Sequence, residues 1–236
     1  MKNILTKIST KLKCNFKEDF INSKEFDNLS KDEKIKILRK SLSKCNNELE
    51  KLKKKYADIF LSKLKTRRSI RKFSGKEVPW EIVYNILESA YTAPAAGDIK
   101  DYKFIVVRDK EDRVELSKIC YQQYWISDAP YIIVVVRDDK HLVELYPNMG
   151  KKYSIQNTAA AIENLLLTVH FYDLGACWVE AYNNDAIRDF LEIPNSFYVD
   201  AIIPIGYPLE NPKKSMPLLR GRIFFDKFGN IYRNKK

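Results

Sequence analysis

Apolar residues in the first part of the chain recur with the period of an α-helix. Ser30 to Lys65 contains no Gly or Pro. Apolar side chains alternate there at steps of three and four residues: Ile35, Leu38, Leu42, Cys45, Leu49, Leu52, Tyr56 and Ile59. This spacing is a heptad seam over more than three repeats. Ser30 followed by Glu33 has the spacing of a capping box at a helix start. The pattern predicts one long helix over about residues 31–65.

The apolar seam of this helix must be buried against something. A coiled coil with a second copy of the chain or with a protein partner is one interpretation, and an amphipathic helix lying on its own domain is the other. Periodicity alone does not distinguish them. Before this helix, apolar residues share one helical face among lysines: Ile4, Leu5, Ile8, Leu12 and Phe16. That face would suit an anionic membrane or RNA, but a solvated, frayed arm is the commoner outcome.

From Arg67 onward, short apolar runs alternate with helical stretches. The runs rich in β-branched and aromatic residues predict strands at Lys103–Arg108, Pro130–Arg137, Ala176–Ala181 and Val199–Tyr207. Helical periodicity predicts helices at Trp80–Tyr91, Lys110–Ile119, Tyr153–Tyr172 and Asn184–Leu191. The segment from Tyr153 to Leu174 is apolar nearly all round, which is typical of a central helix covered by a sheet or by another subunit. The alternation predicts an α/β or α+β domain on a central sheet.

Composition and charge divide the chain at the same place. Among 236 residues, 45% are hydrophobic and only 7 are Gly and 9 Pro, which suits a globular domain with an appendage. The formal net charge is +11. Residues 1–66 hold 18 Lys plus Arg and 9 Asp plus Glu, so about nine units of that charge belong to the appendage. The remaining chain is nearly neutral, and nothing in it resembles a nucleic-acid-binding signature.

Cysteine and histidine usage argues against metal and disulfide chemistry. The four cysteines lie far apart without a C-x-x-C pair, and the chain has two histidines, His141 and His170. A structural zinc site needs about four close N or S ligands, so we expect no metal site.

The longest apolar stretch, Thr158 to Tyr172, is interrupted by polar residues and is too short to span a bilayer. We therefore expect a cytoplasmic protein with reduced thiols.

A compact cluster of cations and one hydroxyl precedes the first helix of the globular domain: Arg67, Arg68, Ser69 and Arg71. Guanidinium groups bind phosphate oxygens through paired hydrogen bonds, and a serine hydroxyl adds another, so the cluster suits a phosphorylated ligand. On composition alone, a solvated basic turn is the favoured interpretation of this cluster.

Several segments in order resemble the FMN-dependent nitroreductase family. The run Arg67 to Phe73 resembles the opening signature that holds the flavin phosphate and ribityl chain, and Ser89 to Asp98 is similar to a second motif that reaches the flavin of the neighbouring subunit. Tyr153 to Tyr182 resembles the dimer-core helix and the strand whose amides face the flavin N5. Ile202 to Pro208 resembles the late core strand, and Arg220 to Arg222 stands where the family returns to the phosphate.

The resemblance implies an α+β fold with a central, mostly antiparallel sheet flanked by helices, and an added N-terminal helix. It divides the chain into a basic helical extension, residues 1–66, and an FMN-binding domain, residues 67–236. It also implies a homodimer with FMN at the interface and NADH or NADPH as co-substrate. The implied cofactor-binding residues are Arg67, Arg68, Ser69, Arg71, Pro94, Ala95, Ala96, Asp98, Gln122, Glu180, Ala181, Arg220 and Arg222.

Flavin N5 would carry the chemistry, so no catalytic side chain is expected. The implied activity is ping-pong reduction of a nitroaromatic, quinone or related acceptor. The alternatives are reductive dehalogenation, flavin fragmentation, or a flavin-binding scaffold that presents the N-terminal helix to a partner. The chain departs from the family at Asp98, usually Asn, and at Lys100 to Tyr102, usually Gln-Pro-Trp or Gln-Pro-Phe. A carboxylate at position 98 disfavours an anionic reduced flavin unless Lys100 offsets it.

Overall fold

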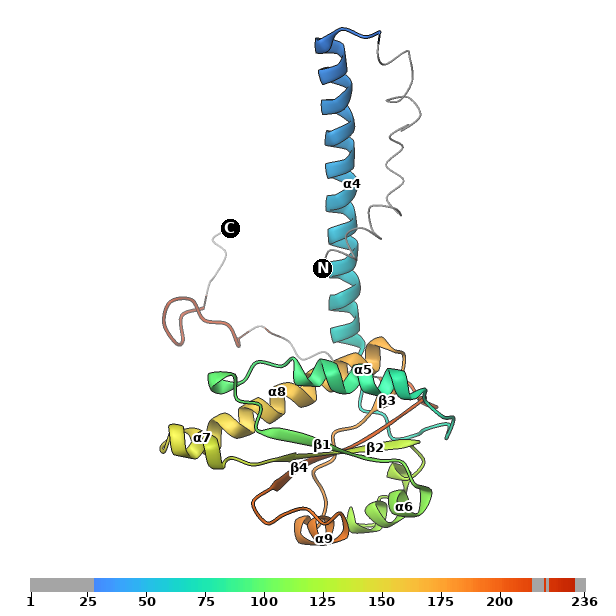
Figure 1. Ribbon diagram of the computed structural model, residues 1–236, viewed down its shortest axis with the longest axis vertical. Coiled ribbons are helices and arrows are strands. Elements are labelled where there is room, and N and C mark those ends of the chain that lie inside the picture. Colours follow the sequence, from blue (N-terminus) through green and yellow to red (C-terminus); the bar gives the residue numbers. More distant parts are fainter. Residues whose placement is uncertain (1–27, 214–218, 220, 232–236) are drawn as a thin grey trace. The chain divides into compact units, whose positions relative to one another are not determined.

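The computed structural model describes residues 28–213, 219 and 221–231 (Figure 1). The chain divides into two compact units, Met1–Ser62 and Lys63–Lys236. The apolar face that the sequence predicts between Ile4 and Phe16 lies outside the described residues. In the described part of the chain, none of the helices is both long and apolar enough to cross a membrane.

The long N-terminal helix is present. Helix α4 spans Lys31–Thr66, in close agreement with the predicted range. Its predicted capping box forms as well: the Ser30 amide donates to Glu33 Oε2 at 3.0 Å, and the Glu33 amide donates to Ser30 Oγ at 3.3 Å. These two bonds satisfy backbone donors that a helix start otherwise leaves to water. The hydrogen bonds also lower the pKa of Glu33, which keeps its carboxylate charged.

The second unit is built on a four-stranded sheet. Its strands are β1 (Tyr102–Val107), β2 (Tyr131–Arg137), β3 (Gly175–Ala176) and β4 (Tyr198–Gly206). Their order is β1-β2-β4-β3, and all three strand pairs are antiparallel. This confirms the predicted α+β fold with an antiparallel sheet. The central register places Val134 opposite both Ile105 and Ile202.

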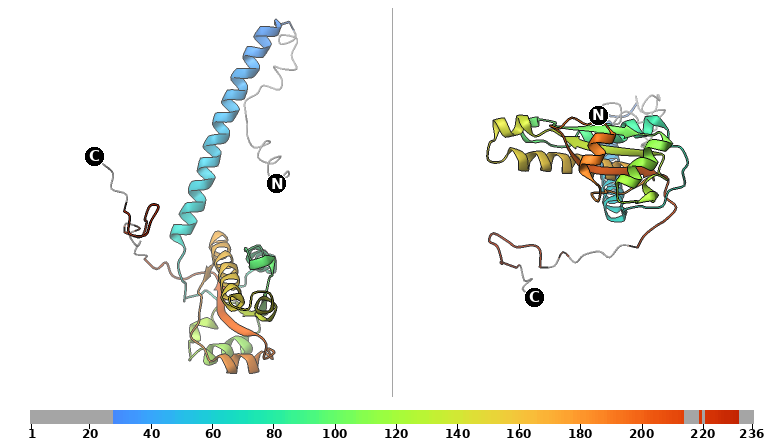
Figure 2. Two further views of the ribbon diagram at one scale, coloured as in Figure 1. Left: turned by 90° about the vertical axis from the view of Figure 1, so that its left-hand side faces the viewer. Right: turned by 90° about the horizontal axis from the view of Figure 1, so that it is seen from below.

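Helices cover both faces of the sheet (Figures 1 and 2). Helices α5 (Trp80–Tyr91) and α8 (Gly150–Phe171) pack on one face, and α6 (Lys110–Ile119) and α9 (Asn184–Phe190) on the other. Alternate residues of β2 belong to the two cores: Ile133 and Val135 face α5 and α8, whereas Ile132 and Val134 face α6 and α9. A strand covered on both sides is apolar at every position, which explains its uninterrupted apolar run.

Two details differ from the sequence predictions. The predicted strand Ala176–Ala181 ends at Ala176, and only Val179 continues the pairing, through a single bridge to Ile202. The loop Asp138–Lys152 contains a helix that the sequence pattern did not predict, α7 (Lys140–Leu145). The short helices η1 (Ala96–Asp98) and η2 (Tyr124–Ile126) complete the unit.

The segment that follows α4 pairs with β3, at the edge of the sheet, and with the chain beyond β4. Ser69 forms a parallel bridge with Ala176, and the Ile70 amide donates to the Ala176 carbonyl at 2.9 Å. Four residues on, Phe73 bridges Pro208 in the antiparallel sense. Gly175 permits this close approach, because a Cβ there would lie 2.8 Å from side-chain carbons of Ile70. The predicted phosphate-binding run is therefore held as an extended segment.

Candidate functional site

The cationic side chains of the extended segment do not all point in the same direction. Ser69 and Arg71 share one side of the extended segment, because successive side chains of extended backbone point in opposite directions. Arg67 stands where α4 ends, since its amide still donates to the Lys63 carbonyl at 3.1 Å. All three lie close enough to act on the Cys177 thiol, whose pKa is influenced by hydrogen bonding to Ser69 and by the charges of Arg71 and Arg67. The structure therefore brings three of the predicted site residues together beside the chain that follows β3.

Cys177 itself is a buried thiol. Desolvation raises its pKa, and the neighbouring arginines and Ser69 oppose that rise only in part. A thiol held in its protonated form is a weak nucleophile. This environment is that of a packing residue, not of a reactive thiol.

Arg71 is the most available cation of the group. Its backbone amide donates to Glu210 Oε1 at 2.6 Å, and its guanidinium lies 5.9 Å from the centre of the Trp125 ring. Among the described residues, the guanidinium has no ion-pair partner. Glu210 and Trp125 were not identified from the sequence, because neither lies in a motif that marks it.

The chain after β3 supplies further polar groups. The indole nitrogen of Trp178 is buried and has no hydrogen-bond partner in the part of the chain that the structure describes. A buried donor without a partner costs about 1–3 kcal/mol, so a ligand that accepts from it would recover that energy. Glu180 and Ala181 follow within three residues and are exposed.

The glutamine beside this chain is Gln123. Its side-chain nitrogen donates to the Ala181 carbonyl at 3.0 Å and to the Cys120 carbonyl at 2.9 Å. The sequence left open whether Gln122 or Gln123 would contact a flavin, and Gln122 is exposed with a positive φ of 62°. The sequence contained both residues side by side, and only the backbone turn decides which of them faces Ala181.

The second predicted motif, Pro94 to Asp98, is held by a different part of the fold. The Ala96 amide donates to Asn157 Oδ1 of α8 at 2.9 Å, and Asn157 Nδ2 donates to Asp101 Oδ1 at 3.0 Å. Ser154 of α8 donates to the other oxygen of Asp101. Lys100 Nζ lies 3.3 Å from Asp98 Oδ1, so the expected offset of the Asp98 charge is present.

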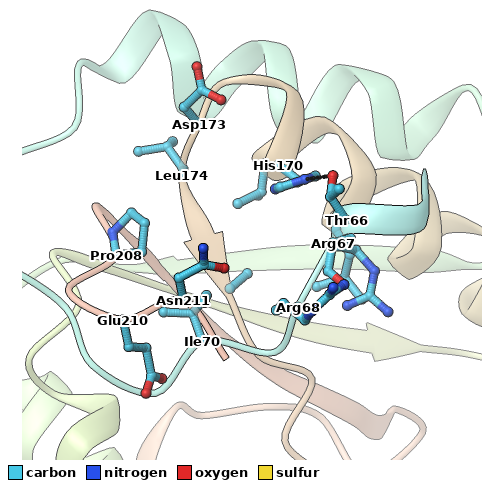
Figure 3. A pocket seen from close by; sticks show the side chains of 13 residues that line it. Thr66, Arg67, Arg68, Ile70, His170, Asp173, Leu174, Pro208, Glu210 and Asn211 are labelled. Atoms are coloured by element: carbon cyan, nitrogen blue, oxygen red, sulfur yellow. Dashed lines mark hydrogen bonds between the residues drawn. The ribbon is translucent and has the colours of Figure 1, made fainter. Parts of the chain in front are cut away.

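A pocket of about 220 Å³ lies beside the start of the extended segment (Figure 3). Arg67 and Arg68 line it near Thr66 and His170, with Glu210 and other residues across from them. The Arg68 guanidinium donates to three backbone carbonyls, at Lys65, Arg67 and Pro212. Arg68 therefore ties the end of α4 to the chain beyond β4, a role that its place in the motif did not indicate.

The C-terminal arginine pair is only partly described. Arg222 is exposed, and its amide donates to the Leu219 carbonyl at 3.0 Å. Arg220 lies outside the described residues. Within the described residues, no three His, Cys, Asp or Glu side chains gather as metal ligands would.

Comparison with known proteins identifies the family. The model of the nitroreductase family matches residues 64–207, more than half of the chain. The chain belongs to the nitroreductase family. Nearly all of α4 precedes the match, so the helical extension is an addition to the family's domain. Members of this family are generally dependent on FMN and NAD(P)H, and they are typically dimeric.

Individual relatives agree with this assignment. A Methanothermobacter thermautotrophicus protein named for NADH dehydrogenase or NAD(P)H nitroreductase activity is 36% identical over 156 residues, covering 64% of this chain and 78% of its own. The solved structure of an FMN-dependent nitroreductase from Clostridium difficile R20291 matches with a TM-score of 0.61 and 30% identity, over 71% of this chain and 99% of that one. An iodotyrosine deiodinase of Nematostella vectensis is 24% identical over 69% of this chain and 71% of its own.

Proposed function

We propose that this nitroreductase-family protein binds FMN and uses NADH or NADPH to reduce a nitroaromatic, a quinone or a related acceptor in a ping-pong scheme. The observation that carries the proposal is the grouping of Arg67, Ser69 and Arg71 around Cys177, in the chain that follows β3. The exposed Arg71 guanidinium, which lies over the Trp125 ring, and the buried indole N–H of Trp178 suit an anionic cofactor rich in hydrogen-bond acceptors.

The chain's residues would bind and orient the cofactor. Arg67 and Ser69 suit its phosphate, because guanidinium and hydroxyl groups donate to phosphate oxygens. Arg71 would stabilise the negative charge that develops on the reduced ring system. FMN supplies the two-electron transfer when bound, so no side-chain nucleophile or general acid is needed. The remaining proposed contacts are Arg68, Pro94, Ala95, Ala96, Asp98, Gln122, Glu180, Ala181, Arg220 and Arg222.

A homodimer with FMN at the interface forms part of the proposal. Pro94 to Asp98 is held on α8 by Asn157, whereas the arginine group surrounds Cys177 beyond β3. Two motifs held by separate parts of one chain are what a cofactor shared between two copies requires. We propose residues 67–236 as the flavin domain and residues 1–66 as an extension that takes no part in the redox chemistry. We also propose a cytoplasmic location, because the described cysteines Cys45, Cys120 and Cys177 are free thiols.

Reductive dehalogenation is a second candidate. Several relatives are named iodotyrosine deiodinases and one is named an iodotyrosine dehalogenase homolog, and they match about two thirds of this chain at 20–24% identity. Both activities would use the same flavin, so the acceptor distinguishes them.

The test of the proposed function is a product assay on the purified full-length chain. Flavin released by denaturation is identified by chromatography, and the reduced protein is then offered a nitroaromatic, a quinone and a halogenated tyrosine. Amine, hydroxylamine or quinol products support the leading proposal, and released halide supports the second candidate. A chain that neither contains FMN nor takes it up on reconstitution contradicts both.

A further inference from the structure

The heptad seam of α4 lies outside the family's domain, and the flavin site does not use it. Its a positions are Ile35, Leu42, Leu49 and Tyr56, and its d positions are Leu38, Cys45, Leu52 and Ile59. We propose that α4 pairs with the α4 of a second copy in a parallel, in-register coiled coil over residues 35–59, with Cys45 facing Cys45 of the other copy. This inference does not rest on flavin binding.

The seam is apolar at every a and d position from Ile35 to Ile59, and five of these eight side chains are exposed in the part of the chain that the structure describes. Leu42 is 61% exposed, Tyr56 is 57% exposed, and Ile35, Leu38 and Ile59 are exposed as well. Isolated helices are marginally stable in water, and most helices in proteins are stabilised by packing of an apolar face. A coiled coil buries such a seam by placing each a or d side chain between four residues of the facing helix.

The seam ends where the second unit begins. The next a position after Tyr56 is Lys63, whose ammonium group donates to Asp173 Oδ1 at 2.6 Å and to the His170 carbonyl at 3.1 Å. Lys63 is therefore committed to the folded unit and is not available to a helical partner. The stretch open to pairing is bounded at Ile59, which leaves about three and a half heptads.

The charges beside the seam favour a parallel pair. In a parallel coiled coil each g position meets the following e position of the other helix, so Glu48 meets Lys53 of the other copy. One repulsive contact, Lys34 with Arg39 of the other copy, accompanies it. An antiparallel pair centred on the seam would place Glu48 against Glu48 and Arg39 against Lys53. The antiparallel arrangement thus has only repulsive flanking contacts among these residues.

The excess positive charge of α4 does not oppose this arrangement. Most of the other lysines occupy the b, c and f positions, which point away from the facing helix: Lys36, Lys40, Lys44, Lys51 and Lys54. Lys53 forms an exposed ion pair with Glu50 of its own helix at 2.7 Å. An exposed pair of this kind contributes only about 0–1 kcal/mol, so Lys53 can exchange it for Glu48 of the other copy at little cost.

Family members are typically dimers, and that makes a second copy the partner of choice. Joining two chains through one interface makes pairing of their second binding segments intramolecular, with an effective concentration of about millimolar where the linker can span the two segments. A moderately long seam is then enough for pairing. A different protein would have to compete with that intramolecular pairing.

Cysteine cross-linking of the full-length protein tests the proposal. Cys120 and Cys177 are buried, so a Cys14→Ser background leaves Cys45 as the accessible thiol. Under mild oxidation with copper phenanthroline, we expect most of this protein to form a disulfide-linked dimer, because facing d positions satisfy disulfide geometry. The matched control carries Cys45→Ser and Asn47→Cys, which moves the thiol to the outward f position. It should cross-link about tenfold more slowly, since its thiols cannot reach each other.

Three outcomes overturn the proposal. The first is absence of cross-linking through Cys45, and the second is equal cross-linking at position 47. The third is preferential linkage of Cys45 to a Leu49→Cys, Cys45→Ser chain expressed with it, which would indicate an antiparallel pair. Helix content from circular dichroism confirms that each variant is folded. Flavin content is measured on the same samples, so loss of pairing and loss of the proposed function are read separately.

Discussion

Asn157 on α8 accepts a hydrogen bond from the backbone amide of Ala96 at 2.9 Å, and this contact fixes the second predicted flavin motif to the central helix. The same side chain donates to the Ile99 carbonyl and to Asp101 Oδ1. Asn157 is only 4% exposed, so its bonds are protected from water. A single side chain therefore holds both ends of the turn that contains η1.

Replacing Asn157 should destabilise the protein and loosen that turn. Asn157→Ala removes three hydrogen bonds, so the Ala96 amide loses its acceptor and Asp101 loses one of its donors. We therefore expect the free energy of unfolding to fall by about 2–4 kcal/mol. Urea denaturation measures it. The neighbouring exposed residue provides the control, since Gln156→Ala should change stability by less than about 0.5 kcal/mol. Equal stability of the two variants would contradict the role given to Asn157.

Arg71 should contribute directly to flavin affinity. Arg71→Ala removes a cation without an ion-pair partner among the described residues, and loss of a charge-assisted hydrogen bond weakens binding by about 1.5–3 kcal/mol, or roughly 10- to 100-fold. Fluorescence titration of the apoprotein with FMN measures the change. Lys72→Ala is the matched control, because its exposed side chain points to the opposite side of the extended segment. If both variants bind FMN as tightly as the parent, Arg71 lies outside the site.

Gly175 should tolerate no side chain. A Cβ at this position would lie 2.8 Å from Cβ, Cγ1 and Cγ2 of Ile70, so Gly175→Ala must push the extended segment away from β3. Overpacking of this kind costs about 1–3 kcal/mol, and FMN affinity should fall with it. The double variant Gly175→Ala, Ile70→Ala removes two of the three clashing atoms. It should therefore lose less stability than the sum of the single variants, and simple additivity would refute the clash.

His170 should make stability fall as the pH drops below neutrality. Desolvation and the charges of Lys63, Arg67 and Arg68 lower its pKa in the folded chain, although Asp173 opposes them. The unfolded chain, with a histidine pKa of about 6.5, then takes up the proton first. The His170 contribution is fully present above that value and is lost as the pH falls toward the folded pKa.

His170→Gln should therefore reduce the difference in melting temperature between pH 7.5 and pH 5.5. The other histidine of the chain supplies the control, because His141 is exposed and lies on α7. His141→Gln should retain the parent's pH dependence. A His170→Gln variant with an unchanged pH profile would show that the imidazole titrates alike in both states.

Much of the fold followed from periodicity. The bounds of α5 and α6 agree with the prediction to the residue, because Pro79 precedes α5 and the side chain of Asp109 caps the start of α6. The short strand β3 was predicted too long, since Trp178 to Ala181 has the composition of a strand while only Val179 finds a pairing partner. Amino-acid composition shows which residues a strand can accommodate, whereas strand pairing depends on neighbours that are distant in the sequence.

The site was harder to derive. The arginine cluster was visible as a local run, but Asn157 was one of several polar residues on α8, and Glu210 lay in a segment with no motif. Their roles arise from contacts across about 60 and 140 residues of sequence, with Ala96 and Arg71 respectively. Which of the two neighbouring glutamines bonds to the Ala181 carbonyl depends on a backbone turn with positive φ at Tyr121 and Gln122. Local pattern does not specify such contacts.

The most direct test of the central claim is an anaerobic titration of the purified full-length protein, reconstituted with FMN, with NADH and separately with NADPH. The proposal predicts a flavin absorption band in the visible spectrum that at least one nucleotide bleaches in a single two-electron step. The band should return when a nitroaromatic or a quinone is added. A colourless protein after reconstitution, or a bound flavin that neither nucleotide bleaches, would contradict it.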